Sequence, residues 1–390
     1  MRTRIRNWLE ERQLPRAAKA ERQRDRQGLP AVDPGTDRVL PALMAWMAAA
    51  QDHSRTRDGG VARDFSLVNG WASSYPETTG YIVPTFLAYA ERTGELDWRT
   101  RGLRMADWLV SIQLPDGGFQ GGKVDSTPVV PVTFNTGQIL LGLAAAERAT
   151  GQYRDAMRRA ADWLVRTQDP DGCWRNNPTP FAAQGEKVYE THVAWGLLEA
   201  ARVDSDRGYA EAALANVRWA LRSQSPDGFF RNCCLDDPAH PLTHTLGYAL
   251  RGLLEAYAFT ADPDLLAASL RTADGLLSAL RPDGHLPGRM NPDWTRAVDW
   301  VCLTGSAQVA HCWLLLYQHT NDSRYREAAA CANSYVRRTV RLDGSTGQRG
   351  GVKGSFPVDG DYGRYQFLNW APKFLADSLM LEADLATPGQ

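Results

Sequence analysis

The stretch Ala106-Asp-Trp-Leu-Val-Ser-Ile-Gln-Leu-Pro-Asp-Gly-Gly-Phe119 returns with small changes at residues 161–174 and again at 217–230. Each copy reads as the end of an amphipathic helix, a Pro-Asp-Gly turn and an aromatic residue. The Asp-Gly pair recurs along the whole chain, at Asp58, Asp116, Asp171, Asp227, Asp283 and Asp343, with successive spacings of 58, 55, 56, 56 and 60 residues. A near-constant period of this size predicts a repeat architecture of six units.

Each unit is expected to hold two helices, an outer one before the Asp-Gly turn and an inner one after it. The outer helices have apolar residues at three- and four-residue spacing, whereas the inner ones are apolar on most sides, as is typical of buried helices. The outer helices are expected near residues 36–52, 97–113, 153–168, 208–224, 264–280 and 324–341. The inner helices are expected near residues 77–93, 135–150, 190–203, 243–260, 304–320 and 365–386.

The connections alternate between short and long. Tight turns such as Thr93-Gly94 and Thr150-Gly151 follow the inner helices and indicate antiparallel neighbours. The outer-to-inner connections run to about 20 residues, a length typical of functional loops. We therefore predict an all-α fold, an (α/α)6 toroid or barrel of six helical hairpins, with its cavity and active-site face formed by the long loops. The expected domain covers residues 36–390, after a basic N-terminal arm at residues 1–35.

Composition limits the function classes. The chain is 43% hydrophobic and 23% charged, with a formal net charge of -1, which does not suggest a nucleic-acid partner. No apolar run is long enough to span a membrane or to act as a signal peptide, and six cysteines in 390 residues do not form a disulfide framework. We expect a cytoplasmic setting. The Arg-rich residues 1–27 would suit a peripheral membrane or protein contact, with a solvated arm as the alternative.

Polar residues stand at the start of every expected inner helix, and therefore around one cavity mouth. They are Glu77, Tyr81, Asn135, Gln138, Glu190, His192, His244, Gln308 and Tyr365. Helix capping accounts for part of the pattern, since Asn accepts from free backbone N–H groups and Glu favours the first turn. Capping does not require His, however, nor does it explain why Glu, His, Tyr and Gln converge. The pattern favours a polar pocket.

Two kinds of acid–base chemistry fit these residues. Glu77 and Glu190 would supply the two carboxyl groups that glycoside cleavage needs. Alternatively, His192 and His244, with Tyr81 or Tyr365, would carry protons in an epimerisation or β-elimination. The competing interpretation is that each histidine is a hydrogen-bonded core residue.

Zinc is a third chemistry, with Cys302, His244 and His192 as ligands. The sequence has no Cys-x-x-Cys spacing to support it. We therefore expect no metal and no cofactor.

The Gln-Trp repeats of squalene–hopene and other terpenoid cyclases are similar to two stretches, Gln113-x-x-x-Gly117-x-Phe119 and Gln168-x-x-x-Gly172-x-Trp174. The resemblance covers about residues 36–386. It implies the toroid shared by those cyclases, protein prenyltransferases and many glycan-active enzymes. The Asp-x-Asp-Asp signature of the cyclases is absent, and the prenyltransferase zinc set is only loosely matched by Asp299, Cys302 and His311.

A second resemblance rests on Gly70-Trp-Ala-Ser-Ser-Tyr-Pro-Glu-Thr-Thr-Gly-Tyr81 and Tyr365-Gln-Phe-Leu-Asn-Trp-Ala-Pro-Lys-Phe-Leu-Ala-Asp377. These stretches resemble toroid proteins encoded among bacterial polysaccharide-biosynthesis genes. That resemblance implies a glycan ligand and leaves the reaction open.

Together these features favour a carbohydrate-active enzyme that acts on a saccharide or polysaccharide, with uronate-containing glycans among the candidates, by hydrolysis, elimination or epimerisation. We expect the catalytic residues to be Glu77, Glu190, His192, His244 and Tyr81. The saccharide would be bound by Trp71, Asn135, Gln138, Trp174, Gln308 and Tyr365. One alternative is a terpenoid-cyclase-like or prenyl-binding toroid with a dry, aromatic cavity. Another is a non-catalytic glycan-binding or assembly protein, whose acids would be paired with Arg or would cap helices.

Overall fold

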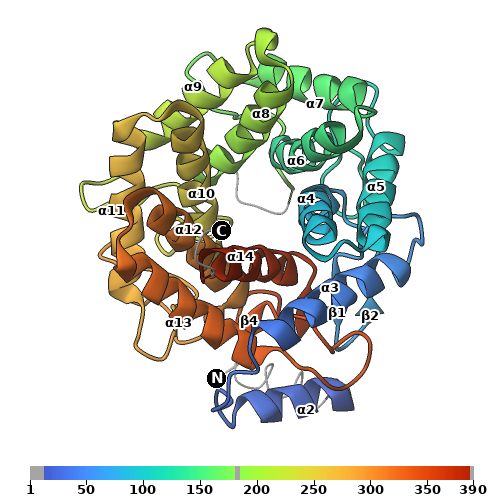
Figure 1. The fold of residues 1–390 in the computed structure, drawn as a ribbon, viewed down its shortest axis with the longest axis vertical. Coiled ribbons are helices and arrows are strands. Elements are labelled where there is room, and N and C mark those ends of the chain that lie inside the picture. Colours follow the sequence, from blue (N-terminus) through green and yellow to red (C-terminus); the bar gives the residue numbers. More distant parts are fainter. Residues whose placement is uncertain (1–12, 181–184, 387–390) are drawn as a thin grey trace.

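The computed structural model describes residues 13–180 and 185–386, and within them the chain forms a ring of helices (Figure 1). The inner helices are α4 (Pro76–Thr93), α6 (Thr133–Thr150), α8 (Thr191–Val203), α10 (Thr243–Thr260), α12 (Leu303–Thr320) and α14 (Trp370–Ala386). The outer helices are α3 (Thr36–Asp52), α5 (Leu96–Ser111), α7 (Arg154–Thr167), α9 (Tyr209–Leu221), α11 (Pro263–Ala279) and α13 (Ser323–Thr339). Two short 3-10 turns, η1 (Val188–Glu190) and η2 (Ser205–Arg207), flank α8. The predicted toroid is confirmed.

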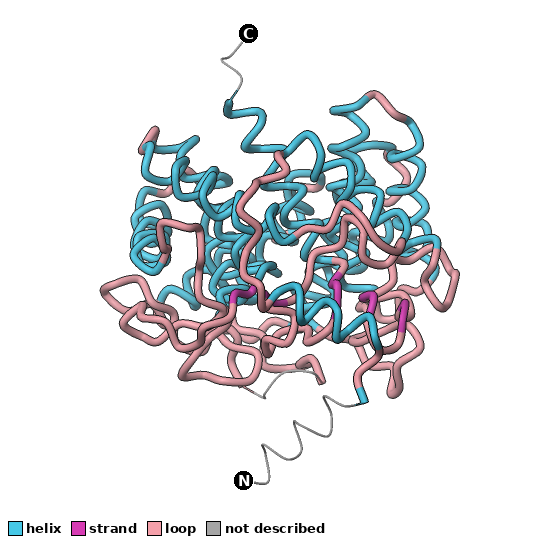
Figure 2. Tube along the Cα trace, turned by 90° about the horizontal axis from the view of Figure 1, so that it is seen from below, coloured by secondary structure: helices cyan, strands magenta, loops and turns pink. Residues whose placement is uncertain are grey.

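Each inner helix packs on the next one, and α14 closes the ring against α3 and α4. The short turns lie on one face of the ring and the long loops on the other (Figure 2). The inner helices α4, α6, α10 and α12 end where a residue turns into the left-handed region, as Gly94 does at φ 73° and Gly151 at φ 74°. Because each long loop leads to the start of an inner helix, the loop face surrounds the helix N-termini.

The repeated Asp-Gly turn joins neighbouring units. Gly117 has φ 100°, and a Cβ there would lie 2.4 Å from the carbonyl oxygen of Arg159 on α7, so only glycine allows this approach. Gln113 Nε2 donates to Gly117 O at 2.9 Å and to Ala156 O at 3.0 Å. The same close approach to the next outer helix recurs at Gly172, Gly228 and Gly284. The repeat therefore fixes the spacing between outer helices.

Short strands tie the last long loop to earlier ones. An antiparallel sheet has the order β2 (Gly70–Trp71), β1 (Asp64–Ser66), β5 (Gln366–Leu368), with Phe65 opposite Trp71 and Phe367. A second pair joins β3 (Val301–Cys302) to β4 (Ser355–Phe356). Residues from the two ends of the domain thus lie side by side on the loop face.

The last inner helix differs from the prediction. We expected it to start at Tyr365, but α14 begins at Trp370. Tyr365 has φ 60°, which no helix accommodates, and the next residues pair with β1 as a strand. This pairing involves residues some 300 positions apart, so helical periodicity could not reveal it.

Part of the basic N-terminal segment is a helix, α2 (Arg16–Asp25), packed under the last long loop. Lys353 is buried, and its Nζ lies 3.0 Å from Glu21 Oε1 and 2.5 Å from Asp25 Oδ1. A solvated arm is therefore wrong for residues 16–25, because buried ion pairs fix them. Residues 1–12, which carry part of the Arg-rich run, lie outside the described residues. None of the described helices is both long and apolar enough to cross a membrane.

Candidate active site

A hollow of about 580 Å³ opens on the loop face, between the first long loop, the second long loop and β5. Basic side chains line it, namely Arg55, Arg63 and Lys123, together with Trp71 and Tyr75. Arg63 lies over the rings of Tyr75 and Trp370, 5.8 and 5.2 Å from their centroids. Its NH1 nitrogen is 2.7 Å from Asp64 Oδ2. These contacts hold a guanidinium at the inner end of the hollow.

Glu77 stands next to this hollow, in the first turn of α4. The Tyr75 hydroxyl donates to Glu77 Oε2 across 3.2 Å, while Oε1 has no hydrogen bond within the described part of the chain. Glu77 is partly accessible, yet enough protein surrounds it that burial raises its pKa to about 7, against the opposing effects of the Tyr75 hydrogen bond and the Arg63 charge. A carboxyl group with this pKa can donate or accept a proton near neutrality.

Glu190 is the second carboxyl group of the expected pair. It is 5% exposed and its Oε2 is buried without a hydrogen-bond partner among the described residues. Burial raises its pKa to about 8, with the Lys187 charge acting in the opposite direction. Burial raises the pKa of Tyr189, and the charges of Glu190 and Glu77 act in the same direction.

The ring centre is filled by an aromatic layer, which consists of Tyr81, His192, His244, Tyr248 and Phe374. Tyr248 lies between the two histidines, with ring centroids 4.5 Å from His192 and 4.4 Å from His244. Phe374 lies 6.0 Å from Tyr248 and 5.4 Å from Tyr81. Four of the inner helices contribute to this layer, so it crosses the axis of the toroid.

The remaining two inner helices supply glutamines that orient the histidines. His192 Nδ1 donates to Gln138 Oε1 at 2.6 Å, and His244 Nδ1 donates to Gln308 Oε1 at 2.5 Å. Burial lowers the pKa of His244 to about 4 and that of His192 well below its usual range. Both rings are therefore neutral at physiological pH, with Nε2 as a bare acceptor. They suit hydrogen bonding better than strong-base chemistry.

The other expected ligand-binding residues lie at different depths. Asn135 is fully buried, and neither polar atom of its side-chain amide has a hydrogen-bond partner among the described residues. Buried amides normally have partners, so a ligand or a water molecule is expected to bind here. Trp71 faces the loop-face hollow. Trp174 is buried, and its Nε1 donates to Leu164 O at 2.9 Å, so the structure gives it a packing partner away from the hollow. Tyr365 is buried with its hydroxyl unpaired in the described structure.

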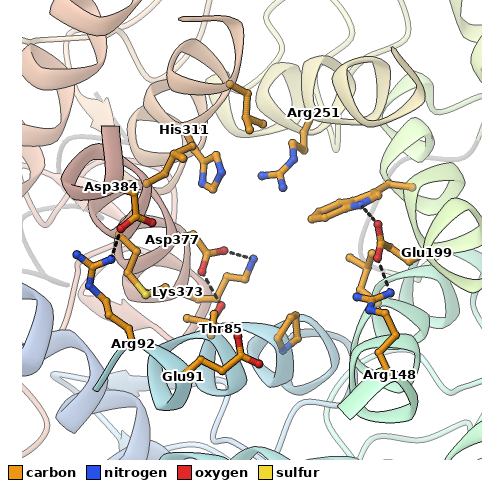
Figure 3. Close-up of a pocket in the computed structure, with 17 residues that line it drawn as sticks. Thr85, Glu91, Arg92, Arg148, Glu199, Arg251, His311, Lys373, Asp377 and Asp384 are labelled. Atoms are coloured by element: carbon orange, nitrogen blue, oxygen red, sulfur yellow. Dashed lines mark hydrogen bonds and ion pairs between the residues drawn. The ribbon is translucent and has the colours of Figure 1, made fainter. Parts of the chain in front are cut away.

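A larger cavity, of about 720 Å³, opens at the short-turn face, opposite to the loop face (Figure 3). All six inner helices line it. None of the expected site residues lines it. Lys373, one of its lining residues, packs against the aromatic layer, with its Nζ 5.2 Å from the ring centroid of Tyr81 and 4.5 Å from that of Phe374. The toroid thus has two hollows with no lining residue in common, and of the expected site residues only Trp71 lines the smaller one.

Sequence reasoning missed several residues of the site. Tyr248 follows His244 by four positions, so helical spacing alone would have placed both on one face. Tyr75 is two residues before Glu77 in a stretch already noted for its resemblance. Arg63 carries no local signal, since the strand pairing of the first loop with β5 brings it to the hollow.

No group of three His, Cys, Asp or Glu side chains is arranged to hold a metal ion anywhere in the described residues. Burial raises the pKa of Cys302 to about 12, which keeps it a thiol rather than the thiolate that binds zinc. All six cysteines are free.

Comparison with known proteins agrees with this architecture. Residues 130–258 match the family model described as the squalene-hopene cyclase C-terminal domain, which is about a third of the chain. An unsaturated glucuronyl hydrolase specific for heparin is similar in structure, with a TM-score of 0.71 and 15% identity over 90% of this chain and 98% of that one. A D-mannose isomerase matches with a TM-score of 0.71 and 13% identity over 92% and 100% of the two chains. The cellobiose 2-epimerase from Bacillus thermoamylovorans matches with a TM-score of 0.69 and 12% identity over 88% and 97%.

These similarities establish the α/α toroid, because sequence identity of this order transfers a fold and not an activity. The cyclase match includes Gln168–Trp174, one of the two stretches that resemble Gln-Trp repeats, whereas Gln113–Phe119 lies before it.

Proposed function

We propose that this protein is an enzyme that acts on a saccharide in the loop-face hollow, with Glu77 as its principal acid–base residue. The observation that carries the proposal is the state of Glu77. It is accessible, its Oε1 has no partner in the described structure, and its pKa is raised by burial to about 7. Such a group changes protonation state near neutral pH, and its hydrogen-bond partner Tyr75 lines a hollow that a ligand can enter.

The hollow itself suggests an anionic saccharide. Arg55, Arg63 and Lys123 line it, whereas Asp64 is its single lining carboxylate in the described part of the chain. Trp71 offers an aromatic ring against which the C–H face of a sugar can stack. A uronate would place its carboxylate on the basic wall and its ring on the indole, which makes a uronate-containing glycan the preferred substrate class.

Glu190 is the proposed second carboxyl group. Its Oε2 is buried and unpaired, and its pKa is raised as that of Glu77 is; neither acid forms an ion pair with Arg among the described residues. This counts against the non-catalytic alternative, in which the acids would be neutralised or used as caps. Hydrolysis, elimination and epimerisation all draw on such groups. The free cysteines suit a reducing, cytoplasmic setting.

The terpenoid alternative has one observation in its favour, the match of residues 130–258 to the cyclase family model. It predicts that prenyl diphosphates, and not saccharides, bind and react.

Mass spectrometry of products from a panel of uronate and neutral oligosaccharides separates these functions. Hydrolysis adds water to the products, elimination splits the chain without adding water, and epimerisation in heavy water adds deuterium without cleavage. Conversion that is lost in Glu77→Gln and kept in Glu211→Gln, an exposed site on α9, supports the proposal. Conversion of prenyl diphosphates with no reaction of any saccharide contradicts it.

A further inference from the structure

The larger cavity on the short-turn face has a cationic floor. Arg251 of α10, His311 of α12 and Lys373 of α14 converge there from three inner helices (Figure 3). Arg251 donates through Nε to Glu255 at 2.7 Å, and its two terminal nitrogens have no protein partner within the described residues. The side chain is 14% exposed, and it lines the cavity. A guanidinium that is held from one side in this way presents two parallel donors on the other.

His311 and Lys373 add further donors. Lys373 Nζ lies 2.7 Å from Asp377 Oδ2 and packs against the aromatic layer. His311 is nine-tenths buried, and its Nδ1 has no partner in the described structure. All three side chains line the same cavity, and burial, together with the charges of Arg251 and Lys373, lowers the pKa of His311. Buried polar groups are normally satisfied, and unfilled donors at one spot indicate a missing acceptor.

Two of the acids at the mouth of the cavity are paired with arginines, whereas Glu91 lines the cavity without a partner among the described residues. Glu199 accepts from Arg148 at 2.7 Å and from Arg202 at 2.6 Å, and Asp384 pairs with Arg92. Above the floor the walls are mainly apolar, formed by Pro84, Ala88, Leu141, Leu315, Met380 and the indole of Trp195. The cavity thus combines an apolar wall with donors at its base.

We propose that the short-turn cavity binds a small organic carboxylate with an apolar body, whose acid group lies on Arg251, His311 and Lys373. Paired hydrogen bonds from a guanidinium fit a carboxylate, and an aliphatic or aromatic body fits the wall. The volume of about 720 Å³ is that of a small-molecule site. A purely apolar ligand would leave the Arg251 donors unfilled, whereas a polyhydroxylated one would meet few acceptors on the wall.

This site is independent of the proposed saccharide function, because the two hollows have no lining residue in common. Titration calorimetry of the full chain with octanoate and benzoate tests it, and the two acids distinguish an aliphatic from an aromatic body. Octan-1-ol serves as the neutral counterpart. Arg251→Gln removes the guanidinium and its paired donors. Ala88→Trp fills the cavity from an exposed position on α4 that tolerates a larger side chain. Glu77→Gln is the control at the other hollow.

We expect saturable binding of at least one acid and weaker binding of the alcohol. Arg251→Gln should weaken binding by about tenfold or more, which is the scale of a lost charge-assisted pair. Ala88→Trp should abolish binding, and Glu77→Gln should leave it unchanged. The proposal is overturned if neither acid saturates at millimolar concentration, if both cavity variants bind as the parent does, or if the alcohol binds as tightly as the acids.

Discussion

The hydroxyl of Tyr75 donates to Oε2 of Glu77 across 3.2 Å, on a carboxyl group whose other oxygen remains free in the described structure. The tyrosine stabilises the ionised form, while burial favours the neutral one, and the pKa settles at about 7. Arg63 lies over the ring of the same tyrosine. A phenol, a carboxyl group and a guanidinium therefore form one connected unit at the inner end of the hollow.

Replacing Tyr75 by Phe should move the pH profile of activity upward. The substitution removes a hydrogen bond that lowers the pKa of Glu77, so the carboxyl group ionises at a higher pH. Whichever limb of the kcat/KM profile reports Glu77 shifts in that direction. Tyr257→Phe is the control. Tyr257 lies near the C-terminal end of α10, remote from Glu77, so its loss should leave the pH profile unchanged. An unmoved profile in Tyr75→Phe would show that the limb belongs to another group.

Replacing Glu190 by Gln should stabilise the protein at alkaline pH and not at acid pH. The pKa of Glu190 is raised in the folded chain, from 4.5 to about 8, so folding resists its ionisation. The free-energy cost of keeping Glu190 buried is absent below about pH 4.5, increases between pH 4.5 and about pH 8, and is constant above that. Each pKa unit corresponds to about 1.4 kcal/mol, which makes the gain a few kcal/mol at most. Urea denaturation at pH 4.5 and pH 8.5 measures it, with exposed Glu211→Gln as the control. Equal stability changes at the two pH values would contradict the burial of this carboxyl group.

Gly172→Ala should destabilise the fold far more than Gly151→Ala. Both glycines have positive φ, 93° and 74°, so each alanine is strained by about 1–2 kcal/mol. A Cβ at Gly172 also lies 2.4 Å from the carbonyl oxygen of Ala215, whereas nothing lies within 4 Å of one at Gly151. The backbone clash adds about 2 kcal/mol or more. Chemical denaturation compares the pair, and equal losses would mean that the Asp-Gly turn does not dock as described.

Lys353→Met should cost about 3–5 kcal/mol in the free energy of unfolding, because it leaves Asp25 buried without its cation, while Glu21 keeps only Arg341, 3.2 Å away. Lys123→Met, at a half-buried position lining the loop-face hollow, is the control for loss of a lysine. If Lys353→Met is as stable as the parent, α2 is not anchored through this ion pair.

The helical repeat could be predicted from the sequence because its signals are local. The Asp-Gly period and apolar spacing mark every hairpin, and the predicted bounds agree with those of α3 and α10. Only part of the candidate site could be predicted from the sequence. Glu77 and Glu190 begin inner helices and were found by position, but the state of each depends on burial. Arg63 reaches the hollow through a pairing between β1 and β5, and such long-range contacts leave no trace in local periodicity.

The most direct test of the account measures binding and turnover together in the wild type and in Glu77→Gln. A uronate oligosaccharide that the wild type converts is titrated into both proteins by calorimetry, while product is followed in the same samples. We predict that Glu77→Gln binds the saccharide with similar affinity and forms no product, because the hollow is intact and the proton carrier is missing. Product formation at the wild-type rate in Glu77→Gln would contradict the central claim.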